Sequence, residues 1–262
     1  GLGCEKVQGG TLTILEPLSA GDPCVETGQR SLQRQGLAEI AAGIGIDLVQ
    51  GAVGIVARDL GVDEVRLAVG RRPARAGKRV TIGFAEEGSH RLIDLQMCAV
   101  LAPRLFALVA PLRALLAAIL PDKRAAHVKM SLVDQGVDLL LEGVRVEGLA
   151  ADEALGDFAR AQALARLTID EGDGPQTRWE PEAATVSFGG AAVGFPPFAF
   201  LQATPDGEAA LVAAVRAAMP ETGPVADLFC GLGTFALALG DARPVYAAEA
   251  ARDVILRLKV AA

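Results

Sequence analysis

A short glycine turn near the C-terminal end constrains the fold of this chain more than any other feature. The turn, Gly231-Leu-Gly233, follows the apolar run Val225-Ala-Asp-Leu-Phe229 and precedes a segment with helical spacing from Thr234 to Leu239. A second apolar run, Val245-Tyr-Ala-Ala-Glu249, comes next. A strand, a tight turn, a helix and a second strand form a βαβ unit, the repeating piece of a parallel sheet. We therefore predict an α/β, Rossmann-like sheet.

This βαβ unit is too small to make a whole nucleotide-binding domain. Only 13 residues follow Glu249, whereas a doubly wound sheet needs several more strands. We expect the sheet to be incomplete in this chain. Either the chain is a piece of a longer one, or loops are missing from the sequence and the ordered segments have been joined directly.

The residues around the turn suit a ligand that carries a nucleoside. Glycine lacks a Cβ and reaches positive φ, so the backbone of Gly231 and Gly233 can approach a ligand closely. The helix that begins near Thr234 presents unpaired N–H groups. Glu249 ends the second strand, 22 residues after Asp227, where a carboxylate can accept hydrogen bonds from both ribose hydroxyls. The alternative that needs no ligand is an ordinary βαβ turn.

Two nucleoside cofactors fit this pattern. Gly231-Leu-Gly-Thr-Phe-Ala236 matches the dinucleotide motif G-x-G-x-x-A, which is typical of an NAD-dependent oxidoreductase. Asp227 favours S-adenosylmethionine, because dinucleotide enzymes more often carry an apolar residue at this strand end. The position of the unit behind a large separate region favours it too. We expect S-adenosylmethionine and keep the dinucleotide as the alternative.

Composition and charge set limits on compartment and partners. The net charge is −7, so any contact with nucleic acid must come from a local basic patch. The apolar run from Leu105 to Leu120 contains Pro111 and Arg113, which indicates a core helix and not a membrane span. The four cysteines do not make a disulfide framework in a chain this long, and no segment has the pattern of a signal peptide. We expect a cytoplasmic monomer without a membrane partner.

The region before the βαβ unit predicts an α+β domain. Alternating runs on either side of turn signals predict two hairpins, Arg79–Phe84 with His90–Leu95 and Val128–Leu132 with Val137–Leu141. Helical spacing predicts helices over 31–49 and 151–165. Further strands are expected near residue 167, over 184–188 and over 191–195.

A basic run lies between two expected strands of this domain. Five of nine residues are cationic and none is acidic: Arg71, Arg72, Arg75, Lys78 and Arg79. Such a run can pair with RNA phosphates, whereas the alternative is a solvated loop.

Several strings between residues 79 and 249 resemble, in order, the RNA 5-methyluridine methyltransferases, which methylate C5 of uridine in 23S rRNA or tRNA. Asp227-Leu-Phe-Cys-Gly-Leu-Gly-Thr-Phe235 resembles motif I of that family. Phe198-Ala-Phe-Leu-Gln-Ala-Thr-Pro205 resembles its F-x-Q-x-N-x segment, with Thr204 in place of the usual Asn. Gly83-Phe84 through His90, and Asp94-Leu-Gln-Met-Cys98-Ala-Val-Leu-Ala-Pro103, resemble its G-F-(R)-x-x-x-S-H and (D)-x-x-x-C-x-x-L-x-P stretches.

The resemblance implies an enzyme that forms 5-methyluridine in 23S rRNA, with a tRNA enzyme, or an RNA-binding relative without an active site, as alternatives. It implies a partial S-adenosylmethionine-binding domain over 198–262, a central α+β RNA-binding domain over 51–197, a linker and helix over 19–50, and a remnant of a TRAM-like β domain over 1–18. The implied cofactor contacts are Gln202, Asp227, Phe229, Gly231, Gly233, Thr234 and Glu249.

Part of this family holds a [4Fe–4S] cluster with four cysteines, three of them in a C-x5-C-G-G-C pattern. Cys98 matches the fourth ligand and Cys24 is a candidate for the first, whereas the C-G-G-C pair is absent. The alternative for Cys98 is a small buried hydrophobic residue. The family nucleophile is a cysteine after a D-P-P-R-x-G segment, which this chain does not contain, so its catalytic residues stay unknown.

Overall fold

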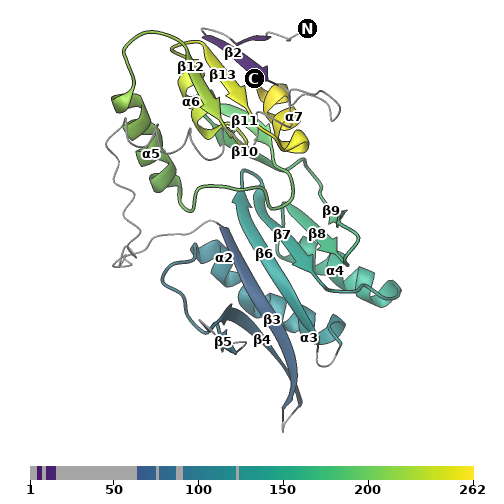
Figure 1. The fold of residues 1–262 in the computed structure, drawn as a ribbon. Coiled ribbons are helices and arrows are strands. Elements are labelled where there is room, and N and C mark those ends of the chain that lie inside the picture. Colours follow the sequence, from purple (N-terminus) through teal and green to yellow (C-terminus); the bar gives the residue numbers. More distant parts are fainter. Residues whose placement is uncertain (1–4, 8–9, 16–63, 75–76, 87–90, 122–123) are drawn as a thin grey trace, which may run out of the picture. The chain divides into compact units, whose positions relative to one another are not determined.

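The computed structural model describes residues 5–7, 10–15, 64–74, 77–86, 91–121 and 124–262 (Figure 1). The described residues all belong to one structural unit. The helix expected over 31–49, Cys24 and Arg75 therefore lie outside the described residues. Within the described part, no helix has the length and apolar character that crossing a bilayer requires.

A seven-stranded sheet forms the middle of the chain, in the order β5-β4-β3-β6-β7-β8-β9. All neighbours are antiparallel except β7 and β8, which are parallel because helix α4 crosses between them. Both expected hairpins are present. The strands are β3 (Glu64–Ala74), β4 (Gly77–Ala85), β5 (Leu92–Asp94), β6 (Ala125–Val133), β7 (Gly136–Glu142), β8 (Arg166–Asp170) and β9 (Pro175–Trp179).

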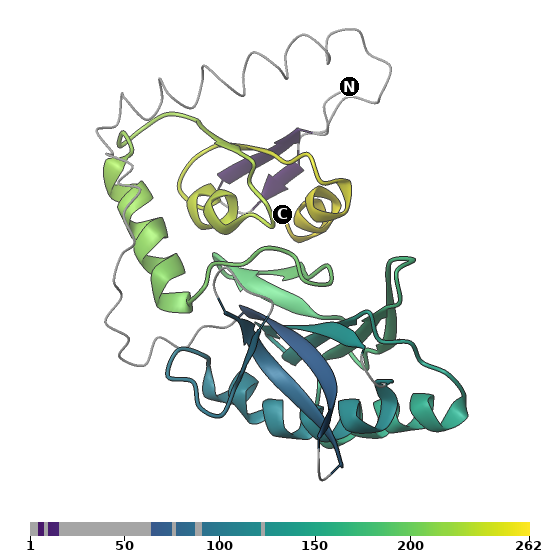
Figure 2. The same cartoon turned by 60° about the horizontal axis from the view of Figure 1, so that its bottom comes forward.

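Three helices lie along one face of this sheet, as Figure 2 shows in blue and teal: α2 (Pro103–Ala107), α3 (Val109–Ile119) and α4 (Leu149–Ala161). Leu105, Leu112 and Leu116 are fully buried against the sheet. Pro111 is the third residue of α3, where a backbone N–H has no partner within the helix, so the proline does not break it. The apolar run is thus buried in the core, as its sequence predicts, but it forms two helices instead of the one expected.

A second, smaller sheet combines two strands from residues 5–15 with two from the C-terminal part, in the order β1-β2-β13-β12. Strands β12 (Val225–Leu228) and β13 (Val245–Ala248) are parallel, and helix α6 (Thr234–Gly240) connects them. This arrangement confirms the predicted βαβ unit. Strand β2 (Gly10–Leu15) pairs in parallel with the other side of β13, and β1 (Glu5–Val7) pairs antiparallel with β2.

A two-stranded ribbon, β10 (Thr185–Phe188) and β11 (Ala191–Gly194), shares its core with this βαβ unit. Phe188 and Phe195 are buried in the same cluster as Leu237 of α6 and Leu258 of α7 (Arg252–Ala261). The boundary expected at residue 197 stays a prediction, and β10–β11 packs with elements on the C-terminal side of it. Helix α5 (Pro205–Ala218) follows this ribbon and buries none of its side chains in the described structure.

Candidate functional site at the glycine turn

Three residues with positive φ shape the turn between β12 and α6. Phe229 has φ 61°, Gly231 has φ 56° and Gly233 has φ 98°. The turn is fixed at both ends, because the N–H of Cys230 donates to Ala248 O on β13 (3.1 Å) and the N–H of Gly233 donates to Cys230 O (2.9 Å). The chain therefore reverses directly at the carboxyl end of the two parallel strands.

The two glycines of the turn differ in what surrounds them. A Cβ on Gly233 would lie 2.6 Å from Leu258 Cδ1 and 3.2 Å from Leu237 Cγ, so this glycine is needed for helix packing. A Cβ on Gly231 would meet nothing within 4 Å. Gly231 thus borders open space, and a ligand can approach its backbone.

Glu249 follows β13 directly, and its carboxylate binds the glycine turn. Its Oε2 accepts a hydrogen bond from the N–H of Gly231 at 3.0 Å, and its Oε1 accepts one from the N–H of Ala251 at 2.9 Å. A carboxylate can accept about four hydrogen bonds, so these two leave capacity for a ligand. The structure thereby brings together Gly231 and Glu249, which the sequence predicts as cofactor contacts.

Asp227 lies on β12, beneath the same turn. Burial raises the pKa of its carboxyl above the ordinary 3.8, a hydrogen bond from the Ala236 N–H lowers it, and the nearby Glu249 raises it. Its Oδ2 is buried and has no hydrogen-bond partner in the described part of the chain. The hydrogen bond from Ala236 anchors the first turn of α6, a structural role that the motif in the sequence does not indicate.

The remaining residues expected to contact the cofactor are Phe229, Thr234 and Gln202. Phe229 has a side chain that is 72% exposed, and Thr234 is the first residue of α6. Gln202 is half-buried in the loop before α5, and no hydrogen bond among the described residues joins it to Glu249. Thr204 caps α5, because its Oγ1 accepts from the N–H of Gly207 at 3.0 Å. Thr204 therefore provides the N-cap hydrogen bond that an asparagine side chain at this position could also provide.

The two described cysteines are both free thiols. Burial raises the pKa of Cys230 to about 12, so this thiol stays protonated at neutral pH. Cys98 is half-buried and its Sγ accepts from the N–H of Leu101 at 3.4 Å. Within the ranges that the structure describes, no three His, Cys, Asp or Glu side chains gather as metal ligands. The described residues do not fit a [4Fe–4S] cluster, which needs about four such ligands.

The described residues of the basic run lie in strands and not in the solvated loop that was the alternative interpretation. Arg71 and Arg72 lie near the end of β3, and Lys78 and Arg79 lie near the start of β4. The run therefore occupies the part of the β3–β4 hairpin next to its turn. Position 72 is the Cα partner of position 79. The alternation of apolar and polar residues in the sequence covers only Val65–Val69, whereas β3 continues through Pro73 to Ala74.

Relatives with similar sequences are RNA methyltransferases, although no family model matches the chain. The chain is 46% identical over 197 residues to an uncharacterized RNA methyltransferase of Zymomonas mobilis, a match that covers 75% of this chain and 50% of that protein. It is 34% identical over 200 residues to the 23S rRNA (uracil(1939)-C(5))-methyltransferase RlmD of Edwardsiella ictaluri, covering 71% of this chain and 45% of that protein. The chain thus spans about half the length of these relatives.

A solved structure has the same fold. The Pyrococcus abyssi tRNA (uracil-54, C5)-methyltransferase, in complex with S-adenosyl-L-homocysteine, superposes with a TM-score of 0.58 at 14% identity. The match covers 78% of this chain and 52% of that one. Together with the sequence relatives, it shows that the sheet of β12 and β13 is part of a Rossmann-like methyltransferase fold. The chain belongs to the RNA methyltransferase family that includes the uracil-C5 methyltransferases.

Proposed function

We propose that this chain carries the S-adenosylmethionine-binding part of an enzyme that methylates C5 of uridine in RNA, with 23S ribosomal RNA as its substrate. One observation carries the proposal: the 3.0 Å hydrogen bond that holds Glu249 Oε2 to the N–H of Gly231, at the carboxyl end of two parallel strands. Ligands of open α/β sheets bind at this edge. The relation to RNA methyltransferases supplies the chemical class.

The residues around the turn fit the three parts of the proposed cofactor. The open space beside Gly231 admits the ligand, and Glu249 can accept hydrogen bonds from the ribose hydroxyls. The exposed ring of Phe229 offers an apolar surface. Asp227 has a buried Oδ2 without a described partner, and a cationic ammonium group would supply one. Gln202 and Thr234 complete the proposed set from the resemblance.

The described residues bind and orient the methyl donor, and the donor supplies an electrophilic methyl group on a sulfonium. Methylation at C5 also needs a thiolate that adds to C6 and a base that removes the C5 proton. Cys230 does not suit the first role, because burial raises its pKa to about 12. Cys98 lies in the seven-stranded sheet region, on the loop that follows β5. We therefore assign the nucleophile to neither of the described cysteines.

Ribosomal RNA is favoured over tRNA by the sequence relation. The relative named for 23S rRNA is 34% identical to this chain, whereas the structure named for tRNA is 14% identical and informs only on the fold. A dinucleotide bound by G-x-G-x-x-A remains the alternative cofactor. The names of the relatives favour S-adenosylmethionine.

The cofactor is tested by thermal unfolding with S-adenosylhomocysteine and with NAD. We expect S-adenosylhomocysteine to raise the melting temperature and NAD to leave it unchanged. Glu249→Gln should weaken S-adenosylhomocysteine about 10-fold or more, since a hydrogen bond to a charged group contributes roughly 1.5–3 kcal/mol. Glu182→Ala removes an exposed carboxylate elsewhere and serves as the control. Stabilisation by NAD alone would overturn the assignment.

The substrate is tested by transfer of a labelled methyl group to unmodified 23S rRNA and to unmodified tRNA. The protein that contains this chain is expected to label 23S rRNA at uridine C5. Label on tRNA alone would replace the ribosomal substrate, and label on neither RNA would refute the proposed activity. The iron–sulfur prediction is checked on the same preparation, because a [4Fe–4S] protein is brown and absorbs visible light.

A further inference from the structure

We propose that the end of the seven-stranded sheet at which β3 and β7 finish and β4 and β6 begin binds the phosphate backbone of RNA without reading its sequence. This end consists of positions 71 and 72 at the end of β3, positions 78 and 79 at the start of β4, and the side chains of Arg124 and Arg145; we call it the basic edge. The inference rests on RNA as the substrate class in the proposed function, and it adds how that RNA is held.

The first half of the basic edge is a two-stranded ribbon that extends beyond the rest of the sheet. Pairing of β3 with β6 ends at Gly70, whose partner is Ala125, and pairing of β3 with β4 continues to Ala74. The last four residues of β3 thus have β4 as their only described neighbour, over ~13 Å at about 3.3 Å per residue. Figure 1 shows this hairpin projecting past the end of β6.

The sequence of the ribbon places like charges at paired backbone positions. Positions 72 and 79 are Cα partners in the register of β3 and β4, and the sequence has arginine at both. Like charges in such positions destabilise a sheet, and an anion placed between them would remove this cost. Pro73 in the same strand lacks an N–H, which disfavours pairing with a further strand. The ribbon therefore suits an anionic partner better than an additional strand.

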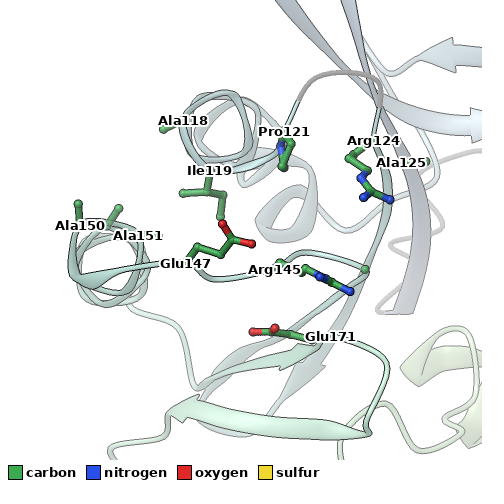
Figure 3. A pocket seen from close by; sticks show the side chains of 12 residues that line it. Ala118, Ile119, Pro121, Arg124, Ala125, Arg145, Glu147, Ala150, Ala151 and Glu171 are labelled. Carbon is green, nitrogen blue, oxygen red and sulfur yellow. The ribbon is translucent and has the colours of Figure 1, made fainter.

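The second half of the basic edge comes from the neighbouring strands. Because β6 runs antiparallel to β3 and parts from it at Ala125, Arg124 lies beside the start of the ribbon. Arg145 follows β7, whose carboxyl end lies at the same edge. Both line a cavity of about 770 Å³, and Figure 3 shows them together on one side of it. The backbone N–H of Arg124 donates to Pro121 O at 3.3 Å, whereas neither guanidinium group makes a hydrogen bond or ion pair among the described residues.

Two acidic side chains lie next to the basic edge, in the cavity that Arg124 and Arg145 line. Glu147 and Glu171 line the same cavity from the side of α4 and of the turn between β8 and β9. Glu171 is already engaged, because its Oε1 accepts from the N–H of Val146 at 3.3 Å and lies 3.9 Å from Arg178. Cations are therefore concentrated on the ribbon side, in a chain whose net charge is −7.

The chemistry of the basic edge favours phosphates over bases. Residues 71–80 contain no aromatic side chain, so the ribbon has no ring on which a base can stack. Guanidinium groups bind phosphate oxygens through paired N–H donors. Contacts of this kind position a nucleic acid and give it affinity, whereas they carry no sequence information. We therefore expect binding that depends strongly on salt and weakly on sequence.

The test measures binding of a labelled 23S rRNA fragment, and of a scrambled fragment of equal length, across a range of KCl concentrations. The ribbon variant replaces Arg71, Arg72, Lys78 and Arg79 with Gln. The slope of log K for RNA binding against log salt is negative, and its magnitude should fall by roughly three in this variant. Each phosphate contact contributes about 0.7–0.9 to that magnitude. The variant Arg124→Gln/Arg145→Gln should lower the magnitude by about 1.5, and both RNAs should respond alike.

Matched controls separate local charge from total charge. Arg160→Gln/Arg252→Gln removes two exposed cations elsewhere and should leave the slope unchanged. Glu147→Gln should strengthen binding slightly. Unchanged slopes in both basic-edge variants would overturn the inference, and so would a wild-type protein that fails to bind RNA. Binding to phosphatidylserine vesicles without binding to RNA would assign the edge to a membrane surface instead and also overturn it.

S-Adenosylhomocysteine binding, measured on the same variants, distinguishes this inference from the proposed function. The basic edge contains no residue of the glycine turn, so the variants should bind S-adenosylhomocysteine as the wild type does. Normal cofactor binding with unaltered RNA slopes would refute the basic edge alone. Reduced RNA slopes in a protein that binds no S-adenosylhomocysteine would refute the cofactor site alone.

Discussion

Asp138 and Arg166 form a bidentate ion pair inside the protein, at Cα-partner positions of the parallel strands β7 and β8. Arg166 Nε and Nη2 donate to the two carboxylate oxygens of Asp138, each at 2.8 Å. Its Nη1 donates to Phe195 O at 2.7 Å. The two side chains are almost fully buried, so one arginine connects the seven-stranded sheet to the segment that follows β11.

Removal of Arg166 should destabilise the protein strongly. Arg166→Met leaves a buried carboxylate without its counter-charge, and we expect the free energy of unfolding to fall by about 3–5 kcal/mol. The double variant Asp138→Leu/Arg166→Met should be less destabilised than the single variant, because it removes both charges. Urea unfolding followed by circular dichroism measures both. A single variant that loses less than about 1 kcal/mol would contradict this account.

The two glycines of the turn should respond differently to a methyl group. Gly231→Ala should cost roughly 1–2 kcal/mol, because φ is 56° there and no atom stands in the way. Gly233→Ala should cost roughly 2–5 kcal/mol, because its Cβ would also press on buried Leu258 at 2.6 Å. Melting temperatures of the two variants compare the costs directly. Equal losses would show that Leu258 yields without strain.

Asp227 should make stability fall as the pH rises. Burial raises its pKa in the folded state above the ordinary 3.8, so the folded protein binds more protons than the unfolded chain in the window above that value. Stability is then greatest below this window and is lost as the pH rises through the folded pKa. Asp227→Asn should remove this loss and weaken S-adenosylhomocysteine binding. The effect on stability is tested by measuring the urea midpoint of the wild type and of Asp227→Asn between about pH 4 and 7. If the midpoints of both proteins change with pH by the same amount, the account of Asp227 is contradicted.

Cys230 should resist alkylation in the folded protein. Burial raises its pKa from 9.0 to about 12, which lowers the thiolate fraction at pH 8 by about 1,000-fold. Iodoacetamide followed by peptide mass mapping should leave Cys230 unmodified in the folded state and label it after urea treatment. Rapid labelling of Cys230 in the native protein would show an accessible thiolate and would reopen its role in catalysis.

The site could be predicted from the sequence because its parts are close together along the chain. Asp227, the two glycines and Glu249 span one βαβ unit, and the pairing of β12 with β13 sets their positions. The partner of β13 on the other side could not be predicted, because Leu12 and Val245 are more than 230 residues apart. A six-residue run in a glycine-rich segment carries no sign of such a distant pairing.

Two elements of the central sheet show where local patterns fail. Strand β9 was missed because four of its five residues are exposed, so it has no alternation of apolar and polar positions. Its pairing is set by the turn before it, where Asp170 Oδ1 accepts from the N–H groups of Gly172 and Gly174. Helix α4 was expected to end at Ala165 and that was wrong. The chain leaves the helix after Ala161, since Ala163 has φ 46° and Leu164 N–H donates to Ala159 O.

The exposed ring of Phe229 has a thermodynamic consequence for any ligand that covers it. Its backbone is already held at φ 61°, so the ring need not be reoriented by a costly change of the main chain. Water now surrounds most of that ring, and a bound molecule would displace it. Transfer of apolar surface out of water lowers the heat capacity, so the heat released on binding should grow as the temperature of the calorimeter is raised.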